Sequence, residues 1–259
     1  MERVTVLIAT YNDEDYIQSS VKSAFDQDYK GPLTICVVSD GSTDNTYTIA
    51  KKFFKSPIEE QDCLYEEGLG KNKNIKYMLT EKTNGGPSDA RNYGISKTIS
   101  ETDIYAILDA DDEMYPNKVS ECVSVMSKDM GSIGVVYADY DTYHTETKKK
   151  IREFKEPFSR RRLVQECIIH SGSLINARAL SSVEEETGYY DREMRTCEDY
   201  DLWMRISEKY MISHVPKSLT LVRVTGDNSS FIVNQDVWQK NWKRVMTKMQ
   251  DRLNGSSLQ

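Results

Sequence analysis

The sequence of 259 residues contains no apolar run approaching the roughly 18–20 residues that a membrane-spanning helix needs. Its five cysteines are odd in number, lie far apart and form no C-x-x-C pair, so neither a zinc site nor a disulfide framework is expected, and a reducing cytosol is favoured. Basic residues are the minority, with 34 Lys and Arg against 41 Asp and Glu, whereas a general nucleic-acid binder usually carries a basic excess. The first apolar run begins at Val4, which leaves no room for a signal peptide, and we expect a cytoplasmic protein.

Short apolar runs alternate with helical patterns over the first half of the chain. The predicted strands are Val4–Ala9, Leu33–Val38, Ile75–Leu79 and Asp103–Leu108. The predicted helices follow Asp13, Thr43, Pro87 and Pro116. This alternation predicts an α/β fold with a mostly parallel central sheet and helices on both faces. Residues 56–74 interrupt the rhythm, and their polar composition predicts a loop or a small insertion.

The second half of the chain has a more mixed pattern. A fifth strand is expected from Val135, and the stretch up to Phe154 alternates enough for hairpins. The later expected elements are a short helix at Arg160–Glu166, a strand at His170–Ile175, a helix at Cys197–Glu208 and strands at Ile212–Val215 and Leu219–Val224. No Pro- or Gly-rich linker divides the chain, so one domain is expected.

Polar clusters follow three of the predicted strands. They are Thr10-Tyr11-Asn12-Asp13, Ser39-Asp40-Gly41-Ser42 and Asp109-Ala110-Asp111-Asp112. In parallel α/β sheets, ligands bind outside the carboxyl ends of the strands. The coincidence of three polar clusters at one edge therefore predicts the binding site there.

Asp109 and Asp111 follow a buried strand and can converge on one hard cation. Oxygen ligands without a nearby His or Cys favour Mg²⁺ or Mn²⁺ over zinc. Such an ion usually keeps water and substrate phosphates among its ligands. The alternative is a solvated acidic turn that caps the next helix.

Three other residues near these strand ends suit a nucleotide. The Asp40 carboxylate could accept the N3–H of a uracil ring, with an Asx turn as the alternative. Tyr11 could stack on a base, although a lone Tyr after a strand more often packs. Arg91 lies early in a helix after a Gly-rich bend, where an arginine fork and helix N-terminal amides suit a diphosphate. It could instead pair with Asp89 or with the acids of 109–112.

A second acidic cluster contains Glu198, Asp199 and Asp201 beside Leu202 and Trp203. Three acids cannot all face solvent on one helical turn that also buries those two apolar residues, so at least one is expected to point toward a site. A carboxylate of ordinary pKa is ionised at pH 7 and can act as a general base. An acid-rich first helical turn is the alternative.

The last predicted helix, about Gln235–Leu253, carries an apolar stripe flanked by basic residues. The stripe consists of Trp238, Trp242, Val245, Met246, Met249 and Leu253. Such a stripe most often packs back onto its own domain. It could instead rest on a membrane surface as a peripheral contact, or bind a partner.

Taken together, these segments resemble the family 2 glycosyltransferases of the GT-A fold. The matching segments are Val6–Asn12, Val37–Asp44, Asn84–Pro87 with Ala90–Gly94, Leu108–Asp112 and Cys197–Trp203. The resemblance covers about residues 3–230. It implies an inverting transferase with a nucleotide-diphospho-sugar donor, most often UDP-linked, a divalent Mn²⁺ or Mg²⁺, and a glycan, lipid-linked or protein acceptor.

The resemblance also divides the chain. It implies a GT-A domain at 1–230, with a nucleotide-sugar half at about 1–115 and an acceptor half at about 116–230, followed by the amphipathic helix and tail at 231–259. The basic run Arg160-Arg161-Arg162 in the acceptor half predicts a solvated helix start, with contact to an anionic acceptor as the alternative.

Residue by residue, the resemblance implies a nucleotide site formed by the strand ends. Thr10, Tyr11 and Asn12 would border the nucleoside. Asp40 would bind the uracil, and Arg91 would lie near the nucleotide.

The resemblance implies roles in the chemistry for three acids. Asp109 would touch the ribose or the metal, and Asp111 would bind the metal. Asp199 would take a proton from the acceptor hydroxyl, whose oxygen attacks the anomeric carbon opposite the nucleotide. The metal would offset the charge of the departing diphosphate. Where the family often has a His, this chain has Thr225.

Two other classes are open. A sugar-phosphate nucleotidyltransferase would normally carry a Gly-rich basic loop after the first strand, where this chain has the acidic, glycine-free segment 10–14. The other class is a catalytically inactive GT-A binding protein. The acids at Asp109, Asp111 and Asp199 count against an inactive protein.

Overall fold

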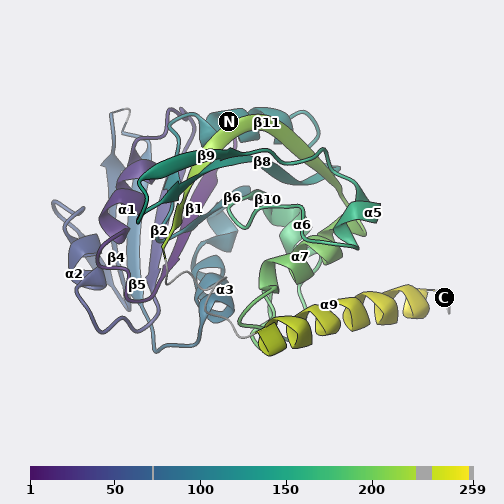
Figure 1. Ribbon diagram of the computed structural model, residues 1–259. Helices are drawn as coiled ribbons and strands as arrows, with labels where there is room; N and C mark the ends of the chain where they lie inside the picture. Colours follow the sequence, from purple (N-terminus) through teal and green to yellow (C-terminus); the bar gives the residue numbers. More distant parts are fainter. Residues whose placement is uncertain (72, 226–234, 257–259) are drawn as a thin grey trace.

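Four parallel strands form the centre of the sheet in the computed structural model, which describes residues 1–71, 73–225 and 235–256 (Figure 1). In spatial order they are β5 (Ile75–Glu81), β2 (Leu33–Ser39), β1 (Val4–Thr10) and β6 (Ile104–Asp109). Strands covered on both faces are apolar along most of their length, and β1 buries every residue except the partly buried Ala9. Thr10 pairs with Ser39 and Ala9 with Asp109, so the carboxyl ends of β1, β2 and β6 lie side by side.

Helices cover both faces of this sheet. Val6 and Ile8 of β1 point to one face and Leu7 to the other, as the two-residue period of a strand requires. The helices on the first face are α1 (Ile17–Phe25), α2 (Thr46–Lys51) and α4 (Lys118–Met126). Those on the second are α3 (Pro87–Thr98) with the 3-10 turn Ile99–Glu101, α5 (Arg160–Leu163), α6 (Ala177–Ser181), α7 (Glu198–Ser207) and α9 (Gln235–Ser256). The predicted α/β fold is confirmed.

The second half of the chain extends the sheet beyond β6 with strands of both directions. β10 (Leu174–Asn176) runs antiparallel to β6 and to β8 (Ile133–His144). β11 (Met211–Val224) runs parallel to β8. β7 (Glu113–Met114) pairs with β11, and β9 (Lys149–Glu153) forms a hairpin with β8. The predicted mixed C-terminal half is therefore present.

Of the two alternatives predicted for residues 56–74, a loop or a small insertion, the structure shows the insertion. This segment forms β3 (Ile58–Glu60) and β4 (Cys63–Leu69), which add an antiparallel hairpin next to β5. The strand signal is weak because the hairpin hardly contributes to the core. Within β4 only Leu64 is buried, and all three residues of β3 are exposed.

Two further boundaries differ from the prediction. The late strands predicted at Ile212–Val215 and Leu219–Val224 are one strand, β11, whose register against β8 shifts on either side of Ser218. Pro216 lies in this irregular stretch, and proline cannot donate a ladder hydrogen bond. The strand predicted from His170 begins only at Leu174, because residues 170–173 turn back on themselves through side-chain and backbone bonds.

Helix α9 packs on its own domain through the middle of its apolar stripe. Val245 is fully buried and Met249 nearly so, in the same core as α7. Trp238 and Leu253 are each 49% exposed, so the two ends of the stripe stay at the surface. The predicted boundary between residues 230 and 231 lies outside the described residues. In the part of the chain that the structure describes, none of the helices is both long enough and apolar enough to cross a membrane.

Candidate active site

The loops after β1 and β2 are tied to each other at the carboxyl edge of the sheet. Asp13 accepts hydrogen bonds from the Thr10 hydroxyl at 2.7 Å and from the Tyr11 amide at 3.0 Å. Asn12, in the left-handed region at φ 58°, accepts a bond from the Thr43 amide at 2.8 Å. The Tyr11 side chain is 50% exposed. The structure thus fixes Thr10 and Asn12 through hydrogen bonds within these loops and leaves Tyr11 half exposed.

Asp40 organises the turn that leads into α3. Its buried carboxylate accepts hydrogen bonds from Lys82 Nζ at 2.8 Å, the Gly85 amide at 3.0 Å and the Gly86 amide at 2.8 Å. Gly41 next to it has φ +71°, and a Cβ there would lie 2.8 Å from the Asn84 amide nitrogen. The sequence reasoning missed Lys82, since no local pattern marks it as a partner of Asp40.

The Arg91 guanidinium lies at the centre of the candidate site. It donates to Glu198 Oε1 at 2.7 Å and to Asp109 Oδ1 at 2.8 Å, and the residue is only 8% exposed. Burial alone would lower the pKa of Arg91, but Asp109 and Glu198 raise it above its ordinary value. Arg91 is therefore a permanently charged link between the end of β6 and the first turn of α7.

Asp109 and its neighbours crowd negative charge at the end of β6. Asp109 also accepts a bond from the Ser171 hydroxyl at 2.9 Å. Burial raises the pKa of Asp109, but the Arg91 charge, the Ser171 hydrogen bond and the nearby His170 together outweigh burial, and the net pKa is lowered. Burial, followed by the charges of Asp109 and Asp111, holds the pKa of Asp112 well above its usual range.

A divalent cation fits this donor set. Within residues 1–71, 73–225 and 235–256, no three or more His, Cys, Asp or Glu are grouped so that they could hold a metal ion. Mg²⁺, however, is usually held by one or two carboxylates together with substrate phosphates and water. An ionised Asp109 and the partly buried Asp111 supply such carboxylates, and a cation beside them would relieve the crowding.

A buried lysine lies beneath these acids. Lys118 Nζ donates to the Thr220 hydroxyl at 2.6 Å, and burial lowers the pKa of Lys118 to about 8. Burial and the nearby Lys118 charge lower the pKa of His170 to about 3, so this imidazole is neutral at pH 7. Neither residue belongs to a motif in the sequence. The one sequence signal for a buried Lys118 is its position directly before the apolar Val119 of a predicted helix.

Asp199 lies on the first turn of α7, which starts from the left-handed Cys197 at φ 60°. The residue is partly buried, and its carboxylate accepts a bond from the Tyr200 amide at 2.7 Å. Burial, followed by the charge of Glu198, raises the pKa of Asp199 to about 7. The expectation of an ordinary pKa is therefore wrong. A carboxyl group that titrates near neutral pH is well matched to general-base work.

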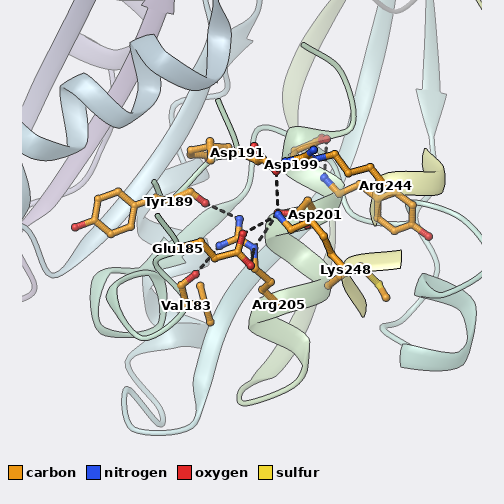
Figure 2. Close-up of polar contacts among 12 residues, drawn as sticks. Val183, Glu185, Tyr189, Asp191, Asp199, Asp201, Arg205, Arg244 and Lys248 are labelled. Atoms are coloured by element: carbon orange, nitrogen blue, oxygen red, sulfur yellow. Dashed lines mark hydrogen bonds and ion pairs between the residues drawn. The ribbon is translucent and has the colours of Figure 1, made fainter. Parts of the chain in front are cut away.

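The other two acids of this helical turn take different directions. Glu198 reaches Arg91 from the first position of α7. Asp201 is fully buried and pairs with Arg205 Nε at 2.8 Å and with Lys248 Nζ of α9 at 3.0 Å (Figure 2). Asp199 thus lies between two residues that form ion pairs, Glu198 with Arg91 and Asp201 with Lys248.

This geometry agrees with the comparison to known proteins. The family described as Glycosyl transferase family 2 matches residues 5–183. The chain therefore belongs to glycosyltransferase family 2. The matched segment ends before α7, so the part played by Asp199 has to be argued from the geometry of that helix.

Similar relatives include two bacterial proteins. A chondroitin synthase of Pasteurella multocida (strain Pm70) is 28% identical over 250 residues, which is 96% of this chain and 23% of the relative. An uncharacterized glycosyltransferase of Rickettsia typhi, RT0329, is 30% identical over 216 residues, 80% of this chain and 60% of the relative. The chain thus spans less than a quarter of the synthase and about three fifths of the second protein.

Solved structures confirm the predicted GT-A fold. S. aureus TarS 1–349 in complex with UDP-GlcNAc has a TM-score of 0.68 and 20% identity, covering 95% of this chain and 65% of that one. The mannosyltransferase PcManGT from Pyrobaculum calidifontis, in complex with GDP-Man and Mn²⁺, has a TM-score of 0.60 and 18% identity, covering 88% and 58%.

Proposed function

We propose that this chain is an inverting glycosyltransferase that moves a sugar from a UDP-linked donor to an acceptor hydroxyl. The observation that carries the proposal is the buried link through Arg91. It joins Asp109, at the sheet edge where a donor would bind, to Glu198, next to Asp199. Donor groups and a titratable carboxyl group therefore share one site.

The donor is proposed from the strand ends together with the solved complexes. TarS was solved with UDP-GlcNAc and PcManGT with GDP-Man and Mn²⁺, so GT-A proteins of similar fold hold nucleotide-sugars. In this chain Thr10, Tyr11 and Asn12 would border the nucleoside, with the exposed Tyr11 ring stacking on the base. Arg91 would stay behind the diphosphate as a fixed positive charge.

The uracil contact proposed for Asp40 has a structural requirement. Both carboxylate oxygens already accept bonds from Lys82, Gly85 and Gly86. A uracil N3–H would therefore have to replace one of these donors, and the Lys82 side chain is the one that can swing away without moving backbone. The main role of Asp40 would then be to stabilise the turn before α3, the helix that carries Arg91.

The chemistry follows from the charges. Asp109 and Asp111 would hold Mn²⁺ or Mg²⁺, which when bound stabilises the negative charge of the departing diphosphate. Asp199 would accept the proton of the acceptor hydroxyl as its oxygen bonds to the anomeric carbon. The bond from that carbon to the diphosphate oxygen breaks at the same time. Because the attack is from the opposite face, the anomeric configuration inverts.

Transfer can be tested with the purified chain, a panel of UDP- and GDP-sugars and a panel of glycan, lipid-linked and peptide acceptors, with and without Mn²⁺. Metal-dependent release of UDP with formation of an inverted glycoside is the expected result. Formation of a nucleotide-sugar from a nucleoside triphosphate and a sugar phosphate would instead identify a nucleotidyltransferase. Tight donor binding without turnover across the panel would identify an inactive binding protein.

A further inference from the structure

Helix α9 holds the segment that carries Asp199 on both sides. Before it, Asn241 Nδ2 donates to the Thr196 carbonyl at 3.1 Å and to its hydroxyl at 2.8 Å. After it, Lys248 Nζ lies 3.0 Å from Asp201 Oδ2 (Figure 2). The two contacted residues, Thr196 and Asp201, lie three positions before and two positions after Asp199.

The contact after Asp199 is a buried charge network. Asp201 and Asp191 have fully buried side chains. Asp201 pairs with Arg205 and Lys248, and Asp191 with Lys248 and Arg244. Breaking one member of a buried ion pair leaves an uncompensated charge, unlike the loss of a surface pair. The shared Lys248 therefore fixes α9 against the first turn of α7 in one arrangement.

The contact before Asp199 restrains strained backbone. Cys197 adopts φ 60°, a conformation that costs a non-glycine residue energy and persists only where the surroundings impose it. Asn241 binds the residue before it, and the Arg91–Glu198 pair holds the residue after it. Loss of either contact would let the backbone at Cys197 relax, and the orientation of the Asp199 side chain would change.

We propose that Lys248 and Asn241 are positioning residues that direct the Asp199 carboxyl group toward the acceptor hydroxyl. This inference rests on the proposed role of Asp199 as the general base. Under it, the C-terminal helix belongs to the framework of the active site, and the stripe on α9 serves that docking.

The chain offers a matched control for the test. Arg252 joins the same helix to the end of α7, with Nε 2.9 Å from Glu208 Oε2, far along the helix from Asp199. Lys248→Met should lower kcat by about 10- to 100-fold, because displacing a catalytic group by about 1 Å costs that much. The KM for the donor should stay unchanged in Lys248→Met, and the conservative variant Lys248→Arg should keep most of the parent kcat. Arg252→Met should keep kcat near the parent value.

Asn241→Ala is a second variant, which leaves no buried charge without its partner. It tests the inference even if Lys248→Met does not fold. It should also lower kcat with an unchanged KM for the donor. Parent-like kcat in both variants would overturn the inference, as would an equal loss in Arg252→Met, which would reduce α9 to a stabilising element. If Asp199→Asn itself turns over normally, the general-base role proposed for Asp199 fails instead.

The segment 148–162 around β9 is rich in basic residues, four of which, Lys150, Arg152, Arg160 and Arg162, pair with carboxylates. Residues 148–162 contain eight Lys and Arg and only two Glu, in a chain whose formal net charge is −7. Two apolar side chains of this segment are exposed, Ile151 at 46% and Phe154 at 77%, and the Arg152 guanidinium lies 5.1 Å from the Phe154 ring centroid. An exposed ring beside a guanidinium is suited to the apolar face and the charge of an acidic sugar.

This basic segment is continuous with the candidate active site. Lys155 Nζ lies 5.4 Å from the Tyr140 ring centroid, and that ring packs on His170 with 4.4 Å between centroids. Ser171, the next residue, donates to Asp109. An acceptor bound in the candidate active site would therefore lie within reach of this basic segment.

We infer that the acceptor is an anionic glycan whose carboxylate, sulfate or phosphate groups lie along residues 148–162. The inference rests on the proposed function, so its test measures binding without donor. The probes are polygalacturonate, dextran sulfate and polyphosphate, with neutral dextran and phosphatidylglycerol vesicles as alternatives. At least one of the three polyanions should bind, with affinity that falls steeply with salt.

The exposed Lys149 and Arg161 supply the test variant, Lys149→Gln/Arg161→Gln. The exposed Lys51, the last residue of α2, and Lys52, which follows it, supply the charge-matched control, Lys51→Gln/Lys52→Gln. The first should weaken polyanion binding at least tenfold and the control should not. Equal loss in both variants, equal affinity for neutral dextran, or binding to the vesicles alone would overturn the inference.

Discussion

Replacement of Asp199 by Asn separates the chemistry of this residue from its effect on stability. The amide keeps the size of the side chain and its acceptor oxygen but cannot carry negative charge or accept the proton of a hydroxyl group. The transfer rate should therefore fall by the ~10²–10⁴-fold that loss of a general base costs. Binding of donor and metal should change little, because Asp199 has no contact with Asp109 or Asp111 in the proposed scheme.

The raised pKa sets the sign of the stability effect. The pKa of Asp199 is about 7 against 3.8 for an ordinary aspartate. The folded protein therefore binds this proton more tightly than the unfolded chain, and stability falls as the pH rises from about 4 to about 7. A shift of about three units corresponds to at most about 4 kcal/mol above pH 7. Partial exposure of the residue reduces this to an expected gain of about 1–2 kcal/mol for Asp199→Asn at pH 8.

Thermal unfolding at two pH values measures this gain without ligands. At pH 8 the Tm of Asp199→Asn should exceed that of the parent by about 2–6 °C, given the size of the chain. At pH 5 the difference should shrink, since Asp199 is already protonated in the folded parent. The kcat/KM of the parent should rise with pH through about 7 as the base loses its proton. Equal Tm differences at both pH values, or a less stable variant at pH 8, would refute the inference that burial raises the pKa of Asp199.

Three other substitutions test the rest of the site. Arg91→Lys removes the fork that reaches Asp109 and Glu198 together, and steady-state kinetics should show a loss of kcat/KM of at least about 100-fold, equivalent to about 3 kcal/mol. Asp111→Ala should abolish Mn²⁺-dependent binding of UDP in calorimetry with little loss of Tm, because it relieves the charge around Asp112; unchanged metal-dependent binding would contradict the metal assignment. Gly41→Ala should lower the free energy of unfolding by about 1–3 kcal/mol in urea titration, because φ is +71° and the new Cβ meets backbone; a neutral result would mean that the turn can move.

The sheet and its polar edge could be predicted because both are local properties of the chain. An apolar run such as Val4–Ala9 reports a strand buried on two faces, and the alternation with helices reports parallel pairing. The carboxyl ends of such strands must meet at one edge, which places Thr10, Asp40 and Asp109 together. The strands of the hairpin at Ile58–Leu69 were not predicted, because they bury too few residues to produce an apolar pattern in the sequence.

The contacts that give the site its properties could not be predicted. Arg91 and Glu198 are 107 positions apart, and no spacing rule relates them. The sequence left Arg91 open between a diphosphate ligand and a partner of the acids at 109–112, and the structure shows the second contact while leaving the first as a proposal. The pKa of Asp199 depends on burial, which composition does not report.

The acidic cluster on α7 shows how one helical turn can divide three similar side chains among different tasks. Successive residues of a helix point about 100° apart, so Glu198, Asp199 and Asp201 face separate surroundings. Glu198 faces Arg91, whose charge it shares with Asp109, and Asp201 faces the cations that hold α9. Burial, followed by the charge of the neighbouring Glu198, raises the pKa of Asp199. The two ion pairs therefore hold the turn in place, while the carboxyl group of Asp199 between them can exchange a proton near neutral pH.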